Sequence, residues 1–75
     1  MTIKEFNNKV DNRKNELLNG DAYELYKRLK GMHMFRYGGI EGFSFDKMLT
    51  ETAQADILDI DFLDNINLEK EIYKL

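Results

Sequence analysis

Residues 2–31, TIKEFNNKVDNRKNELLNGDAYELYKRLKG, decide the fold, because they predict two amphipathic helices joined by a very short link. Thr2 is positioned to cap the first helix, and Glu5 three residues later completes the pattern of a capping box. Gly20 marks the end of this helix, since glycine readily adopts the left-handed conformation found there. One stripe recurs at helical spacing between these signals: Ile3, Phe6, Val10, Arg13, Leu17 and Leu18.

The second helix is predicted to begin at Asp21, which again has an acid three residues later at Glu24. Its pattern ends at Gly31. Two amphipathic helices with so short a link between them predict an antiparallel pair. The apolar face of this second helix consists of Ala22, Leu25, Tyr26 and Leu29.

The middle of the chain fits two structures. Two aromatic-rich runs, 32–37 and 40–45, flank the pair Gly38 and Gly39. This arrangement is typical of a β-hairpin over 32–45 that packs on a helix. It fits equally well a glycine-rich loop whose aromatic side chains enter the core, so both interpretations stay open.

The last third of the chain predicts a third helix that begins at Ser44 or Asp46. From there the pattern is ambiguous, because 58–62 alternates like a strand while 57–66 also fits a helix. The final stretch, 68–75, favours a short helix. The residues expected to face the core are Phe45, Met48, Leu49, Ala53, Ile57 and Ile72.

The composition indicates the fold class and the cellular compartment of the protein. A chain of 75 residues with 43% hydrophobic residues predicts one compact domain, 1–75, that is mainly α with three or four short helices. An α+β fold with the 32–45 hairpin is the alternative. Without cysteine there are no disulfides, and without a long apolar run there is no membrane span or signal core, so we expect a cytoplasmic protein. The abundance of Lys, Asn and Ile fits an AT-rich source genome.

Charge divides the chain into two halves. Residues 1–37, the basic half, carry eight Lys or Arg against five Asp or Glu, a balance of +3. Residues 38–75, the acidic half, carry three against nine, a balance of −6. Such asymmetry indicates binding, steering and partner choice, and it says little about the fold.

No catalytic motif accompanies this charge pattern. The single histidine, His33, lies between two methionines, and we expect it to be structural or solvent-facing. Ser44 lacks the G-x-S-x-G frame of a nucleophile elbow. The glycines Gly38, Gly39 and Gly42 lack the spacing and the lysine of a phosphate loop. We therefore expect no enzyme activity and no cofactor.

Four aspartates of the acidic half fit either a metal site or a solvated acidic surface. The carboxylates of Asp56, Asp59, Asp61 and Asp64 are oxygen ligands of the kind that calcium and magnesium prefer. The EF-hand order and its turn glycine are absent, however, and apolar residues alternate with the acids. We expect a solvated acidic face and no metal.

The first functional hypothesis is a protein-binding module, a small inhibitor or regulator of the phage or mobile-element type. Its acidic half would dock on a basic partner, with a nucleic-acid enzyme as one candidate, and in the sharpest version it would imitate the phosphates of a nucleic acid. Phe62 is a candidate aromatic anchor there and fits a core position as well. The expected docking residues are Glu51, Asp56, Asp59, Asp61, Phe62 and Asp64.

Two alternatives remain open. A small nucleic-acid-binding regulator would use the basic patch at 27–36, where cations alternate with aromatic residues. A dimerisation module or structural subunit would instead use exposed apolar surface, giving a homodimer. The cations of the basic patch are Lys27, Arg28, Lys30 and Arg36.

Overall fold

The computed structural model describes residues 1–60 and 68–75, which form four helices and no strand. These are α1 (Ile3–Leu18), α2 (Ala22–Tyr37), α3 (Phe45–Leu58) and α4 (Leu68–Tyr73). The mainly α prediction is confirmed. Within these residues, no helix is both long enough and apolar enough to cross a membrane.

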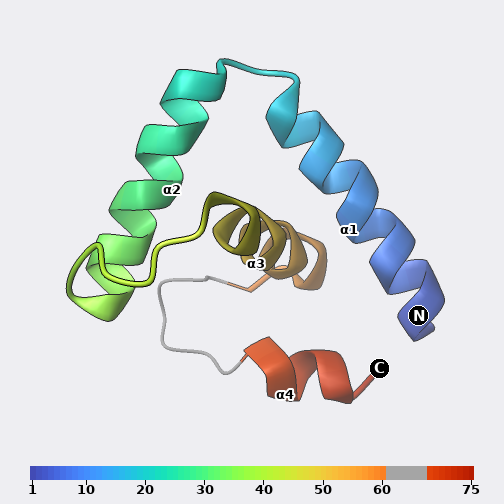
Figure 1. The fold of residues 1–75 in the computed structure, drawn as a ribbon. Coiled ribbons are helices and arrows are strands. Elements are labelled where there is room, and N and C mark those ends of the chain that lie inside the picture. The colour runs from blue at the N-terminus through green and yellow to red at the C-terminus, as the bar shows by residue number, and fades with distance from the viewer. Residues whose placement is uncertain (61–67) are drawn as a thin grey trace.

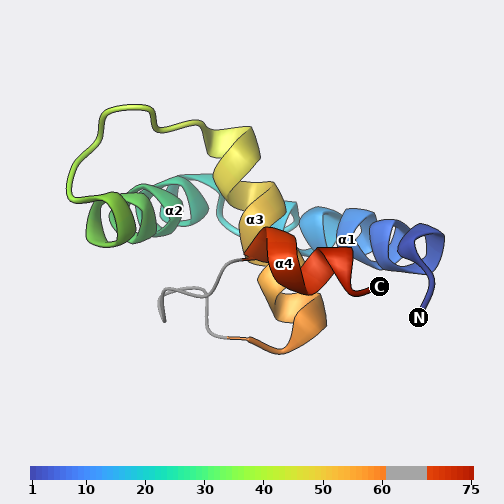
Figure 2. The same ribbon diagram turned by 90° about the horizontal axis from the view of Figure 1, so that it is seen from below.

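The helices are arranged around α3. In Figure 1, α1 and α2 diverge from their short link, and α3 lies between them. Figure 2, turned by 90°, shows α3 running across both helices, with the N- and C-terminal ends of the chain close together. The predicted packing of the first two helices as an antiparallel pair is therefore not found. The buried residues of α1 and of α2 belong instead to two separate clusters, each completed by residues of α3.

The start of α1 follows the predicted capping chemistry, whereas its end does not, because the cap residue Asn19 is right-handed (φ −77°) and Gly20 is not in the left-handed region. Thr2 Oγ1 accepts a hydrogen bond of 3.2 Å from the backbone N–H of Glu5, which satisfies one of the free amides of the first turn. The Thr2 hydroxyl also donates to the Glu5 carboxylate. Asn19 ends the helix, and its N–H bonds to the carbonyl of Asn15 at 3.1 Å.

The second helix is longer than its sequence pattern predicts. Asp21 caps it, as expected, by accepting from the N–H groups of Tyr23 and Glu24. The predicted end at Gly31 is wrong, because α2 continues to Tyr37. Gly31 is exposed in mid-helix, where glycine costs about 1 kcal/mol relative to alanine. The next turn contains the buried His33, and tertiary packing of this kind stabilises a helix beyond its intrinsic propensity.

The segment between α2 and α3 is a loop. Gly38 ends α2 with φ 78° in the left-handed region, and its N–H bonds to the carbonyl of Met34 at 2.9 Å. The hairpin alternative is wrong, because 32–37 is helical and 38–44 contains no strand. Phe43 packs from this loop against the buried cluster of α2 and α3, as in the loop interpretation.

The third helix begins as predicted and ends earlier than one alternative allowed. Ser44 caps it by accepting from the N–H of Lys47 at 3.3 Å. At the end of α3, Asp59 adopts the left-handed conformation (φ 56°). The N–H of Asp59 donates to the carbonyl of Asp56, and the N–H of Ile60 donates to the carbonyl of Ala55. This pair of bonds is a Schellman motif, and it ends the helix that was considered for 57–66. The remainder of that stretch, and part of the 58–62 strand pattern, lies outside the described residues.

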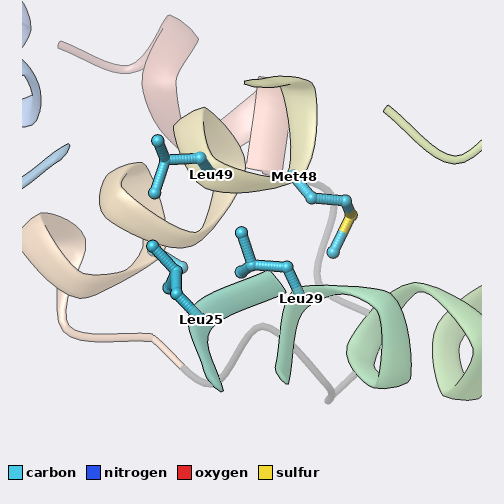
Figure 3. Close-up of a cluster of buried hydrophobic side chains, with 5 residues drawn as sticks. Leu25, Leu29, Met48 and Leu49 are labelled. Atoms are coloured by element: carbon cyan, nitrogen blue, oxygen red, sulfur yellow. The ribbon is translucent and has the colours of Figure 1, made fainter. Parts of the chain in front are cut away.

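The core has two parts, and both include α3. Figure 3 shows Leu25 and Leu29 of α2 pointing toward Met48 and Leu49 of α3, and Leu29 is 0% exposed. On the other side of α3, a second cluster contains Phe6 and Val10 of α1, Ala53 of α3 and, at its edge, Ile72 of α4. Because α3 contributes to both clusters, it joins the two arms of the fold.

Candidate functional site

The basic and acidic halves meet inside the fold, along the contact between α1 and α3. Arg13 Nε donates to Asp56 Oδ2 at 2.9 Å, near the end of α3. Lys14 Nζ lies 3.7 Å from Asp46 Oδ1, in the first turn of α3. Two neighbouring cations of α1 thus reach acids at opposite ends of α3.

Arg13 has the most extensive polar contacts of these side chains. Its Nη1 also donates to Glu16 Oε2 at 3.0 Å. The hydrogen bond to Asp56, followed by the bond to Glu16, raises the pKa of the Arg13 guanidinium above its ordinary value. The last turn of α3 contains no basic residue, so Arg13 brings a cation to the negative end of that helix. Asp56 is consequently engaged within the fold, although sequence analysis placed it in a docking surface.

These pairs change the charge that each half presents. Two of the cations in the basic half are paired with two acids of the acidic half. Subtracting one charge for each pair reduces the basic half from +3 to +1 and the acidic half from −6 to −4. These two ion pairs offset two charges in each half, and the formal acidic surplus stays the larger of the two.

The other predicted docking residues fall into two groups. Glu51 is half-buried on α3 and Asp59 is exposed at its end. Neither side chain makes a hydrogen bond or ion pair in the described part of the chain. The residues that lie outside the described ranges are Asp61, Phe62 and Asp64.

The cations predicted for nucleic-acid binding all lie on α2, but the helix distributes them around its circumference. At about 100° per residue, Lys27 and Lys30 lie within about 60° of each other. Arg28 lies about 100° from Lys27, and Arg36 lies about 180° from Lys27. Lys27 and Arg28 are exposed, whereas Lys30 and Arg36 are half-buried. The structure therefore does not bring the four cations together on one face.

Several of these cations also contact rings or acids of the same helix. Lys27 lies 5.0 Å from the ring centroid of Tyr23, and its Nζ is 3.4 Å from Glu24 Oε1. Lys30 lies 6.0 Å from the ring centroid of Tyr26. These contacts occupy part of the aromatic and cationic surface that stacking with a nucleic acid would need.

His33 was predicted to be structural or solvent-facing, and the fold buries it. It is buried, and Nδ1 lies 3.0 Å from the carbonyl oxygen of Gly39. The rings of Tyr37 and Phe43 pack against it with centroids at 4.7 and 5.5 Å. Only the return of the 38–44 loop over α2 creates this environment, and the hairpin and loop interpretations did not specify it.

Among the described residues, no three His, Cys, Asp or Glu side chains converge as a metal site would require. Comparisons of the chain with protein-family models, with curated proteins and with solved structures gave no significant match. The functional argument therefore rests on the residues themselves.

Proposed function

We propose that this protein is a non-enzymatic binding module that docks its acidic half on a basic surface of a partner protein. The observation that carries the proposal is the acidic surplus that remains after two cations of the basic half pair with two acids of the acidic half. The ion pairs between α1 and α3 leave the basic half with a balance of +1 and the acidic half with −4. A surface with this surplus attracts a basic partner and speeds its association.

Two exposed or half-exposed carboxylates support the proposal within the described residues. Glu51 and Asp59 have no side-chain partner there, so their negative charge is available to a binding partner. Asp59 also occupies a left-handed position at which glycine would be less strained. A carboxylate at this position near the negative end of α3 is unfavourable for the helix, which fits a role in binding better than one in folding.

The distribution of cations argues for this proposal over nucleic-acid binding. The cations of α2 point in different directions around the helix, and Lys27 and Lys30 lie over tyrosine rings. Neutralising phosphates along a strand needs several cations on one track. Regulation or inhibition of a nucleic-acid enzyme through its basic groove is the finer form of the proposal.

The test begins with affinity capture from a low-GC bacterial lysate, with and without nuclease, read by mass spectrometry. A captured basic protein is then purified, and its affinity is measured for two variants of equal charge change. Glu51→Gln with Asp59→Asn alters the acidic half, and Asp11→Asn with Glu24→Gln alters the basic half. Comparing them separates a local effect from a change in net charge.

We expect the acidic-half variant to weaken binding at least about tenfold, which corresponds to about 1.4 kcal/mol. The basic-half variant should keep an affinity within about twofold of the unmodified chain. Equal weakening by both variants would contradict local docking. Loss of every partner after nuclease treatment would favour a nucleic-acid ligand instead.

A further inference from the structure

A cavity of about 260 Å³ lies where the end of α2, the 38–44 loop and the start of α3 meet. Its polar lining comes from His33, Tyr37, Glu41, Ser44 and Lys47. A water molecule occupies about 30 Å³ in the liquid, so this volume exceeds that of a few trapped waters. None of the residues argued above to bind a partner protein lines it.

His33 lines this cavity, and only one of its two ring nitrogens has a partner among the described residues. A carbonyl oxygen only accepts hydrogen bonds, so Nδ1 carries the hydrogen that it shares with Gly39. Tyr37 and Phe43 pack against the ring. The side chain lines the cavity although it is only 6% exposed, and Nε2 is its one polar atom without a partner among the described residues. This nitrogen is therefore the polar group that the buried ring offers to a ligand.

The remaining lining groups are mostly hydrogen-bond donors. Tyr37 and Ser44 contribute hydroxyl groups, and Lys47 contributes an ammonium group. Ser44 and Lys47 also belong to the first turn of α3, whose helix dipole favours negative charge. The lining includes one carboxylate, Glu41, which is exposed. Asp46 in the same turn is paired with Lys14 at 3.7 Å.

From these groups we propose that the cavity binds the phosphate group of a small molecule. Lys47 and the hydroxyl of Ser44 donate to the anionic oxygens. A phosphate that retains one hydrogen can donate it to neutral Nε2 of His33, and its oxygens can accept from the charged ring. A carboxylate near neutral pH offers acceptors only, so it cannot donate to a neutral Nε2 as a phosphate that retains a hydrogen can. The cavity also has room for several atoms beyond the phosphate.

The experiment uses the single histidine as its probe. Nitrogen-15 NMR of the His33 ring is recorded while inorganic phosphate is added at constant ionic strength. We expect a saturating shift of the Nε2 signal at about millimolar phosphate. Replacing Lys47 by glutamine should weaken binding about tenfold, whereas Lys9→Gln, an equal charge change on an exposed residue of α1, should leave it unchanged.

Comparing further ligands shows whether the cavity binds a phosphate monoester, free phosphate or any small anion. Tighter binding of glycerol phosphate than of inorganic phosphate would assign the site to a phosphate monoester, and the reverse order would assign it to free phosphate. Acetate that binds as tightly as phosphate would overturn the proposal. So would the absence of saturation below about 10 mM, or equal affinities for Lys47→Gln and the unmodified chain. Because Lys47 is exposed, this variant is expected to fold.

Discussion

The two long helices α1 and α2 have the same length, 16 residues, and the same number of lysines and arginines, four each. The cations of α1 include two that bind acids of α3, Arg13 and Lys14. The cations of α2 lie around the helix, and Lys27 and Lys30 contact tyrosines of their own helix. Helices with equal numbers of cations thus use their positive charge in different ways.

The phase of the buried stripe explains the difference. Arg13 follows Val10 in the stripe of α1 that faces α3, so its guanidinium extends toward the acids of that helix. In α2 the buried stripe runs through Leu29 and His33, which leaves Lys27 on the far side. The charge balance of each half therefore indicates only how many charges it carries. The position of each charged residue relative to the buried stripe of its helix determines whether it pairs within the fold or faces a binding partner.

The packing of α1 on α3 should be weakened most by Phe6→Ala. Phe6 is 0% exposed and belongs to the cluster that joins α1 to α3. We expect a loss of about 3–5 kcal/mol in the free energy of unfolding, from lost burial and the cavity left behind. Urea denaturation measures it, with Leu18→Ala on the exposed part of α1 as the control. Equal destabilisation by the two variants would contradict the assigned core.

The helix shared by both arms should be strengthened by Thr52→Val. Thr52 is 2% exposed, and its Oγ1 has no hydrogen-bond partner in the described part of the chain. Removing a buried hydroxyl without a partner is expected to raise the free energy of unfolding by about 1 kcal/mol. Thermal denaturation of the variant beside Thr50→Val, whose hydroxyl donates to the Asp46 carbonyl, checks this expectation. A destabilised Thr52→Val variant would show that the hydroxyl is satisfied.

The end of α3 should respond to Asp59→Gly with a smaller gain. Glycine relieves the left-handed backbone at this position, and the change also removes a negative charge from the negative end of the helix. We expect a stabilisation of about 0.5–1 kcal/mol together with weaker binding to the basic partner. Denaturation and affinity measurements on the same sample test both effects. Stabilisation with unchanged binding would remove Asp59 from the docking surface.

Local signals in the sequence predicted the starts of three helices. Thr2, Asp21 and Ser44 each accept hydrogen bonds from backbone amides within three residues, so their role depends only on nearby sequence. The end of α2 was misplaced because Gly31 is a local stop signal that burial of the next turn overrides. The sequence pattern around Gly31 does not show whether the local stop signal or the burial of the next turn prevails.

The candidate sites depend on contacts far apart in the sequence. Arg13 and Asp56 are 43 residues apart, and neither position indicates the other. The cavity beside His33 exists only because the 38–44 loop returns over α2. Composition therefore indicates the acidic surplus, and the acidic binding surface stays a prediction, whereas the ion pair of Asp56 and the environment of His33 depend on the fold.

The most direct test of the charge account is a double-mutant cycle on Arg13 and Asp56, using Arg13→Gln and Asp56→Asn. The pair joins the two halves, so we expect a coupling energy of about 0.5–1 kcal/mol that decreases in high salt. The same cycle on Lys27 and Glu24, an exposed pair within α2, should give about 0.3 kcal/mol. A coupling at Arg13 and Asp56 no larger than this reference would contradict the account. Arg13 would then remain available to a partner, and the reduced charge of the basic half would no longer follow from the fold.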